Sequence, residues 1–194
     1  MISRGVRRDW RYGTGSASGF LGRDTVRFGS PGTDQLVVPR CTFGQATKLA
    51  PFFAGQPIDG ILGLAFKSIA VDGVTPPFIE AIQQGLVDEP VFTVFMKHVG
   101  DQVNVDGGVF TYGGIDTTNC GRIIAWERLS SATYWQFTMN SVKSRTFSQQ
   151  RSWQVISDTG TSLIGAPSGI VQRIAREVGG RVRCHVKLQI CFSL

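Results

Sequence analysis

The sequence contains few charged residues, few histidines and few cysteines. Charged side chains make up 18% of its 194 residues, and it has two histidines and four cysteines. The low charge and the 42% hydrophobic fraction exclude an intrinsically disordered chain. No run of 18 apolar residues occurs, so we expect no membrane-spanning helix. No Cys-x-x-Cys pair occurs, and neither His98 nor His185 has an acidic or cysteine partner pattern, so we expect no metal site.

The positive charge is concentrated at the two ends of the chain. Of the net charge of +6, residues 1–11 carry +3 and residues 173–187 carry +4, whereas residues 12–172 carry −1. A nucleic-acid-binding domain concentrates basic charge on its folded face. Charged ends are commonly solvated tails, so we expect no nucleic-acid partner. Residues 1–8 contain no apolar core of the kind found in signal peptides.

Glycine and phenylalanine, by contrast, are abundant. The 24 glycines and 13 phenylalanines indicate short strands joined by many turns. Segments rich in β-branched and aromatic residues between turn signals are predicted to be strands. These segments are residues 16–22, 25–29, 35–39, 90–96, 109–112, 123–126, 135–139 and 153–156.

Two segments are predicted to be short helices. The first begins at Pro76-Pro77, has apolar residues at helical spacing and ends at Gly85. The second is predicted to be capped by Ser168 and to end at Gly179-Gly180. The expected fold is therefore mostly β with two or three short helices.

The strongest chemical signal is the segment Ile156-Ser157-Asp158-Thr159-Gly160-Thr161-Ser162-Leu163. An apolar strand delivers one carboxylate into a turn of glycine and small hydroxyl residues. Such hydroxyls and backbone N–H groups can hydrogen-bond a carboxylate and fix its orientation. Taken alone, Asp-Thr-Gly is a common tripeptide, and an ordinary β-turn is the alternative interpretation.

The context of this segment favours the chemical interpretation. It resembles the active-site signature of the pepsin-like aspartic peptidases, in which two hydrophobic residues and Ser or Thr precede Asp-Thr-Gly. Other segments resemble that family in the same order along the chain, over about residues 12–184. They are the flap-like residues 12–19, the hydrophobic-hydrophobic-Gly region 59–65, the glycine pairs 107–108 and 113–114 with residues 115–116, and residues 134–137.

The resemblance implies a bilobal, mostly β pepsin-like fold and peptide hydrolysis without a cofactor or metal. In that family two aspartates share one proton, because two neighbouring carboxyl groups cannot both be ionised without strong repulsion. The aspartic peptidase pair is the well-known example of a carboxyl pKa raised in this way. One carboxylate activates a water, and the other hydrogen-bonds the substrate carbonyl. By resemblance, Asp158 is the catalytic aspartate of the second lobe.

The resemblance also assigns supporting roles in the turn. Thr159 would tie two active-site turns together, and Gly160 would let another backbone or a ligand approach closely. Thr161 and Ser162 would supply hydroxyl groups near the carboxylate.

The glycine-rich segment near the N-terminus would be the flap. Tyr12 would be the flap tyrosine, with Gly13 and Thr14 contacting substrate through their backbones, and the closed flap would exclude solvent. The alternative for Tyr12 is simple packing within a hairpin.

The sequence departs from the family pattern at both ends. No Asp-Thr-Gly precedes Tyr12, and no second hydrophobic-hydrophobic-Gly segment follows Asp158. Ile61-Leu62-Gly63 is expected to be a structural segment that fills the core beside an active-site turn. We therefore expect two incomplete lobes: a basic stretch outside the family pattern at 1–11, the rest of the N-terminal lobe at 12–112 and a partial C-terminal lobe at 113–194.

Three functions are consistent with this pattern. The first is an aspartic endopeptidase acting on proteins at acid pH, represented here by a truncated form with one dyad aspartate that is itself inactive. The second is a non-catalytic relative that binds peptides or regulates another protein. The third, ranked lowest, is a dimer in which each copy supplies Asp158; we expect no oligomer.

The expected partner is a protein or peptide, with no membrane partner, and the resemblance implies a secreted or lysosomal location.

The four cysteines do not define a disulfide framework. Cys41, Cys120, Cys184 and Cys191 allow three full pairings, and the sequence does not choose among them.

Overall fold

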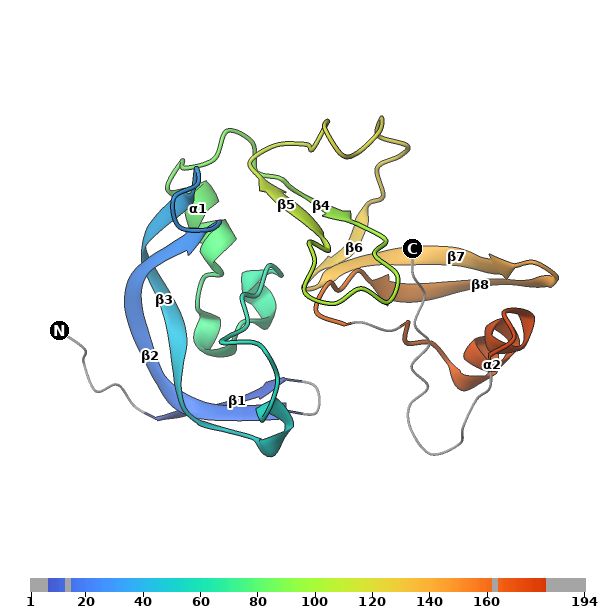
Figure 1. The fold of residues 1–194 in the computed structure, drawn as a ribbon, viewed down its shortest axis with the longest axis horizontal. Helices are drawn as coiled ribbons and strands as arrows, with labels where there is room; N and C mark the ends of the chain where they lie inside the picture. The colour runs from blue at the N-terminus through green and yellow to red at the C-terminus, as the bar shows by residue number, and fades with distance from the viewer. Residues whose placement is uncertain (1–6, 13–14, 162–163, 181–194) are drawn as a thin grey trace. The chain divides into compact units, whose positions relative to one another are not determined.

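The structure is a computed structural model that describes residues 7–12, 15–161 and 164–180 (Figure 1). These ranges contain eight strands, two α-helices and three short 3-10 helices, so the prediction of a mostly β chain is confirmed. The chain divides into two compact units. The first contains residues up to Thr93 together with Thr111–Ile115, and the second contains Val94–Phe110 and the residues from Asp116 onward.

A three-stranded antiparallel sheet forms most of the first unit. Its strands are β1 (Arg8–Tyr12), β2 (Gly15–Phe28) and β3 (Leu36–Leu49), in that spatial order. Figure 1 shows β2 and β3 as two long, bent ribbons. The sequence predicted two separate strands, at 16–22 and 25–29, where the structure has the single strand β2. A register shift between Asp24 and Val26 lets the strand continue through the residues that were interpreted as a turn. Strand β1 was not predicted.

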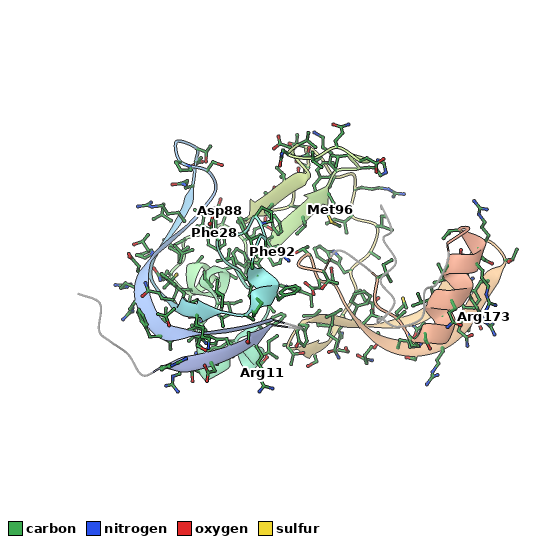
Figure 2. All side chains as sticks on the ribbon, turned by 60° about the horizontal axis from the view of Figure 1, so that its bottom comes forward. Arg11, Phe28, Asp88, Phe92, Met96 and Arg173 are labelled. Atoms are coloured by element: carbon green, nitrogen blue, oxygen red, sulfur yellow. The ribbon has the colours of Figure 1, made fainter. Side chains whose placement is uncertain are left out.

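The core of the first unit lies between this sheet and helix α1 (Pro77–Gln83). Buried residues of the sheet meet buried residues of the helix: Phe28, Val38, Cys41, Phe78 and Ala81. The rings of Phe92 and Tyr112 pack against this cluster, and Figure 2 labels Phe92 together with the cluster residue Phe28. The predicted helix is confirmed, with a proline in its first turn and Gly85 beyond its end at a φ of 67°.

Short irregular elements follow the first sheet. The 3-10 helices are η1 (Pro51–Phe53), η2 (Lys67–Ile69) and η3 (Val71–Gly73). An ion pair between the Arg8 guanidinium and the Asp72 carboxylate, 3.3 Å apart, connects β1 to η3. Strands β4 (Phe92–Met96) and β5 (Gly108–Tyr112) then form a two-stranded sheet, and the boundary between the two units passes through both strands.

The second unit is built on another antiparallel sheet. Strands β6 (Leu129–Ala132), β7 (Trp135–Ser144) and β8 (Phe147–Ile156) lie in that order. Helix α2 (Ser168–Glu177) lies against β8. Its buried face and one buried side chain of β8 form the local core: Val171, Ile174, Ala175 and Phe147.

Three local expectations are wrong. Residues 123–126 form no strand, and the side chain of Ile124 is 98% exposed, because no described segment pairs with this stretch. Ser168 does not cap α2: Pro167 occupies the cap position without a side-chain hydrogen bond, and Ser168 is the first helical residue. Ile61 and Leu62 are 58% and 46% exposed, so they do not fill a core among the described residues.

Two cysteines lie within the described ranges, and no disulfide joins them to each other. Cys41 is buried, and burial raises the pKa of its thiol. Cys120 is partly buried. Cys184 and Cys191 lie outside the described residues, so the bonds that these two cysteines would form remain untested. Across the described part of the chain, no helix is long and apolar enough to cross a membrane.

Candidate functional site

Strand β8 ends at Ile156 and places Asp158 just beyond the end of the sheet formed by β6, β7 and β8. Ile156 pairs with Gln136 of β7, and the amide of Ser157 donates a hydrogen bond of 3.0 Å to the carbonyl oxygen of Trp135. The strand pairing therefore holds the backbone up to the residue before Asp158. From there the chain leaves the sheet and turns.

Both carboxylate oxygens of Asp158 accept a hydrogen bond from the turn itself. The backbone amide of Gly160 donates to Oδ1 at 2.9 Å, and the hydroxyl of Thr161 donates to Oδ2 at 2.6 Å. The amide of Thr161 also approaches the carbonyl oxygen of Asp158 at 3.4 Å. Because each oxygen has its own donor, the plane of the carboxylate is fixed while the group remains exposed to solvent.

Glycine at position 160 is explained by the closeness of this carboxylate. A Cβ added to Gly160 would lie 3.3 Å from Oδ1 of Asp158, which is tighter than an ordinary van der Waals contact. A larger residue would have to displace the oxygen that the amide of Gly160 holds. This contact gives a physical reason for the Asp-x-Gly spacing.

The other predicted turn residues contribute less to this geometry. Thr159 is exposed, and its hydroxyl forms no hydrogen bond to any residue that the structure describes. Ser162 lies outside the described residues. The structure thus brings together Asp158, Gly160 and Thr161, and the roles predicted for Thr159 and Ser162 stay predictions.

A polar ladder lies on one face of the sheet that carries Asp158. The side-chain amide of Gln136 donates to Oε1 of Gln154 at 3.1 Å, and the side-chain amide of Gln154 donates to the hydroxyl of Thr138 at 3.0 Å. The hydroxyl of Ser130 also donates to Oε1 of Gln154. These cross-strand bonds connect all three strands just before Asp158. Sequence analysis did not identify this ladder, because its members are up to 24 residues apart.

The predicted flap segment does form an antiparallel hairpin. Tyr12 ends β1 and is the register partner of Gly15, which begins β2. Gly13 and Thr14 lie outside the described residues, and so does the side chain of Tyr12. The hairpin belongs to the first unit, whereas Asp158 belongs to the second.

Trp10 anchors this hairpin to the rest of its sheet, and sequence analysis missed it. Its side chain is 6% exposed. The ring lies 2.9 Å from where a Cβ added to Gly19 or to Gly44 would be, so the two glycines form the space that it occupies. The sequence does contain a signal, the glycines Gly19 and Gly44. They can be recognised as two sides of one space only when the register between β2 and β3 is known.

Phe53 of η1 packs against the start of β2. A Cβ added to Gly15 would lie 2.7 Å from its ring. An open pocket of about 250 Å³ lies nearby, lined by Ser16, Ser18, Lys48, Leu49, Ala50 and Pro51. No cluster of three His, Cys, Asp or Glu side chains suitable for a metal ion occurs within the described ranges.

Comparisons with known proteins show which family this chain resembles over most of its length. A family model described as eukaryotic aspartyl protease matches residues 3–191, a range that begins inside the basic stretch 1–11. Aspartic protease 2 of Necator americanus is 54% identical over 170 residues, which cover 88% of this chain and 40% of that protein. Pepsin A of Rhinolophus ferrumequinum is 40% identical over 186 residues, which cover 94% of this chain and 46% of that protein.

A solved structure shows the same fold. The Haemonchus galactose containing glycoprotein complex matches with a TM-score of 0.75 and 46% sequence identity, over 93% of this chain and 57% of that one. The chain spans less than half of the length of the two relatives named above.

Proposed function

Because this chain belongs to the eukaryotic aspartyl protease family, we propose that it supplies one catalytic aspartate, Asp158, of an endopeptidase that cleaves proteins at acid pH. The observation that carries the proposal is the hydrogen-bonded turn in which Gly160 and Thr161 each hold one oxygen of an exposed carboxylate. A carboxylate fixed in this way can orient a water molecule toward a peptide carbonyl.

The proposed reaction requires a second carboxylate. A single carboxylate cannot both accept the proton of the attacking water and donate a hydrogen bond to the substrate carbonyl. The 194-residue sequence contains Asp-Thr-Gly once. The second aspartate would therefore come from sequence other than these 194 residues or, as the less favoured alternative, from a second copy of this chain, and a single copy alone is expected to hydrolyse little or no protein.

The hairpin of β1 and β2 is proposed to be the flap. Its geometry supports this role, because β1 is held by the buried Trp10 and by the ion pair between Arg8 and Asp72. Tyr12, Gly13 and Thr14 would contact the peptide, and closure over the peptide would exclude water. Thr159 would join the turn of Asp158 to the turn that carries the second aspartate.

The partner of the active form is proposed to be a protein or peptide, without a cofactor or a metal. A secreted or lysosomal location follows from the family. A monomer is favoured over a pair of chains that each supply Asp158.

A second candidate function is peptide binding or regulation without catalysis. The observation that favours it is again the single Asp-Thr-Gly of the sequence. In that case the hairpin would still hold a peptide, but no water would be activated.

Sequencing the full transcript separates the two candidates at low cost. An in-frame Asp-Thr-Gly upstream of the hairpin supports the endopeptidase. A confirmed translation start at Met1 supports the non-catalytic relative. The encoded protein is then assayed on a denatured protein at acid pH with and without a statine-type peptide. Hydrolysis that the peptide blocks is the expected result, and a complete lack of hydrolysis by a protein with both aspartates would overturn the proposal.

A further inference from the structure

We infer that helix α2 and the turn between β7 and β8 form a binding surface for a sulfated polysaccharide. Three arginines belong to this surface: Arg145 in the turn, and Arg173 and Arg176 on α2. We call it the arginine face. Figure 2 labels Arg173 on α2, where its side chain is exposed.

Hydrogen bonds and a ring contact place the turn between β7 and β8 against the last turns of α2. The amide of Thr146 donates a 3.0 Å hydrogen bond to the carboxylate of Glu177, and its hydroxyl donates to the same oxygen. The guanidinium carbon of Arg173 lies 5.6 Å from the centroid of the Phe147 ring. Arg145 is the direct neighbour of Thr146, and Arg176 is the direct neighbour of Glu177. The contact between one turn and one helix therefore brings the backbone positions of the three basic residues close together.

The charge of the arginine face is only partly offset by its surroundings. Arg145, Arg173 and Arg176 are exposed, and none of them forms an ion pair with the part of the chain that the structure describes. Glu177 is the one acidic residue of α2 and offsets part of this charge; one oxygen of its carboxylate accepts hydrogen bonds from Thr146. Residues 129–180 contain five basic and two acidic residues, so the positive potential extends over this part of the unit.

Guanidinium groups match a sulfate ester in both charge and shape. The planar fork of arginine donates paired N–H bonds to anionic oxygens and keeps its charge at every pH in the acid range. Phe147 lies beneath Arg173, which limits the positions that this guanidinium can adopt. A sulfate group also stays ionised at acid pH, whereas the carboxylates of an acidic protein partner are progressively protonated there.

Other polyanions fit the arginine face less well. Phe147 is only 8% exposed, so the face offers no aromatic ring on which a nucleic-acid base could stack. The exposed residues of α2 are Ser168, Gly169, Arg173 and Arg176. None of these is apolar, and Val178 at the C-cap, 51% exposed, is a single apolar side chain where insertion into a lipid surface requires an apolar face.

Binding to heparin tests the inference directly with the 194-residue chain. The variant Arg145→Gln, Arg173→Gln, Arg176→Gln is compared with the wild type at pH 5 in about 0.1 M salt. We expect the dissociation constant for a heparin fragment to rise by roughly tenfold or more. The logarithmic salt dependence of binding should also become shallower by about two to three counterions.

Two controls distinguish this surface from net charge. The variant Arg27→Gln, Arg122→Gln, Arg128→Gln removes the same charge from exposed positions outside the arginine face and should bind as the wild type does. Lys143 pairs with Ser148, one step along the ladder from the pair of Ser144 and Phe147, so its side chain points to the face of the sheet opposite α2. Lys143→Gln should therefore have little effect.

Several results would overturn the inference. One is equal loss of heparin binding in the two triple variants, with circular dichroism showing that both are folded. Another is no heparin binding by the wild type. Equal binding of desulfated heparin, or tighter binding of single-stranded DNA or of anionic lipid vesicles, would show that sulfate is not the group recognised.

Discussion

The amide of Gly160 donates a 2.9 Å hydrogen bond to Oδ1 of Asp158, and a Cβ on Gly160 would come within 3.3 Å of that same oxygen. One residue therefore both orients the carboxylate and leaves the space that the carboxylate needs. Thr161 holds the other oxygen. The turn presents a single carboxylate in one fixed orientation to solvent, which suits the role proposed for it as one of two carboxylates that act on water.

The hydroxyl of Thr161 is predicted to matter for catalysis. In the full-length protein, Thr161→Val should lower kcat by roughly tenfold, because one oxygen of Asp158 loses its donor. Thr161→Ser keeps a hydroxyl and should retain most of the rate. Steady-state kinetics on a peptide substrate at acid pH measures both variants. Equal rates for the valine and serine variants would show that this hydrogen bond does not position the carboxylate.

The space beside Trp10 is predicted to be essential for the stability of the first unit. In Gly44→Ala, the new Cβ would lie 2.9 Å from the Trp10 ring and force it to move. Overpacking of this kind costs about 1–3 kcal/mol in the free energy of unfolding. Gly63→Ala is the matched control, because nothing lies within 4 Å of a Cβ added there. Urea unfolding followed by tryptophan fluorescence gives both values, and equal stabilities would refute the anchoring role of Trp10.

The contact between Glu177 and Thr146 predicts a pH dependence of stability in the second unit. The hydroxyls of Thr146 and Ser144 lower the pKa of the Glu177 carboxyl below its ordinary value of 4.5. A carboxyl with a lowered pKa stabilises the folded state above the unfolded pKa and loses that contribution as the pH falls through the folded pKa. The attachment of α2 to the turn between β7 and β8 should therefore weaken only below about pH 4.5.

Thermal unfolding between pH 3 and pH 7 checks this dependence. Glu177→Gln should lower the melting temperature at pH 7 and reduce the difference between pH 7 and pH 3. Glu127→Gln, at an exposed position, is the control and should keep the wild-type profile. An unchanged profile in Glu177→Gln would contradict the assignment.

Sequence was a good guide where the structure depends on neighbouring residues. The turn of Asp158 was predicted because its donors, Gly160 and Thr161, are two and three residues away. Helix α1 was predicted for a similar reason, since its proline and glycine boundaries lie within the segment itself.

Contacts between distant residues could not be predicted in this way. Trp10 meets Gly44 only once two strand registers are set, and Thr146 meets Glu177 across 31 residues. The segment 123–126 has the composition of a strand but finds no partner among the described residues, because composition does not supply a pairing strand. Ser168 is a good capping residue by type, yet the helix begins one position too early for it to cap.

The flap assignment predicts an order of effects in the full-length protein. Tyr12→Phe should lower kcat/KM less than Asp158→Asn does, because the flap positions substrate and excludes water without moving the proton. Ser162→Ala should be milder still, since it is expected only to orient the carboxylate. Peptide hydrolysis at acid pH ranks the three variants, and a larger loss in Tyr12→Phe than in Asp158→Asn would reverse the roles proposed here.

The rate of peptide hydrolysis by full-length Asp158→Asn, measured against the wild type across the acid pH range, tests the central claim most directly. We expect the variant to lose at least about 10²–10⁴-fold in kcat at every pH, because the pair loses the carboxylate that activates water. Its circular dichroism should match the wild type, since Asp158 is exposed and its removal leaves the sheet intact. Retention of most of the wild-type rate would contradict the account and remove Asp158 from the reaction.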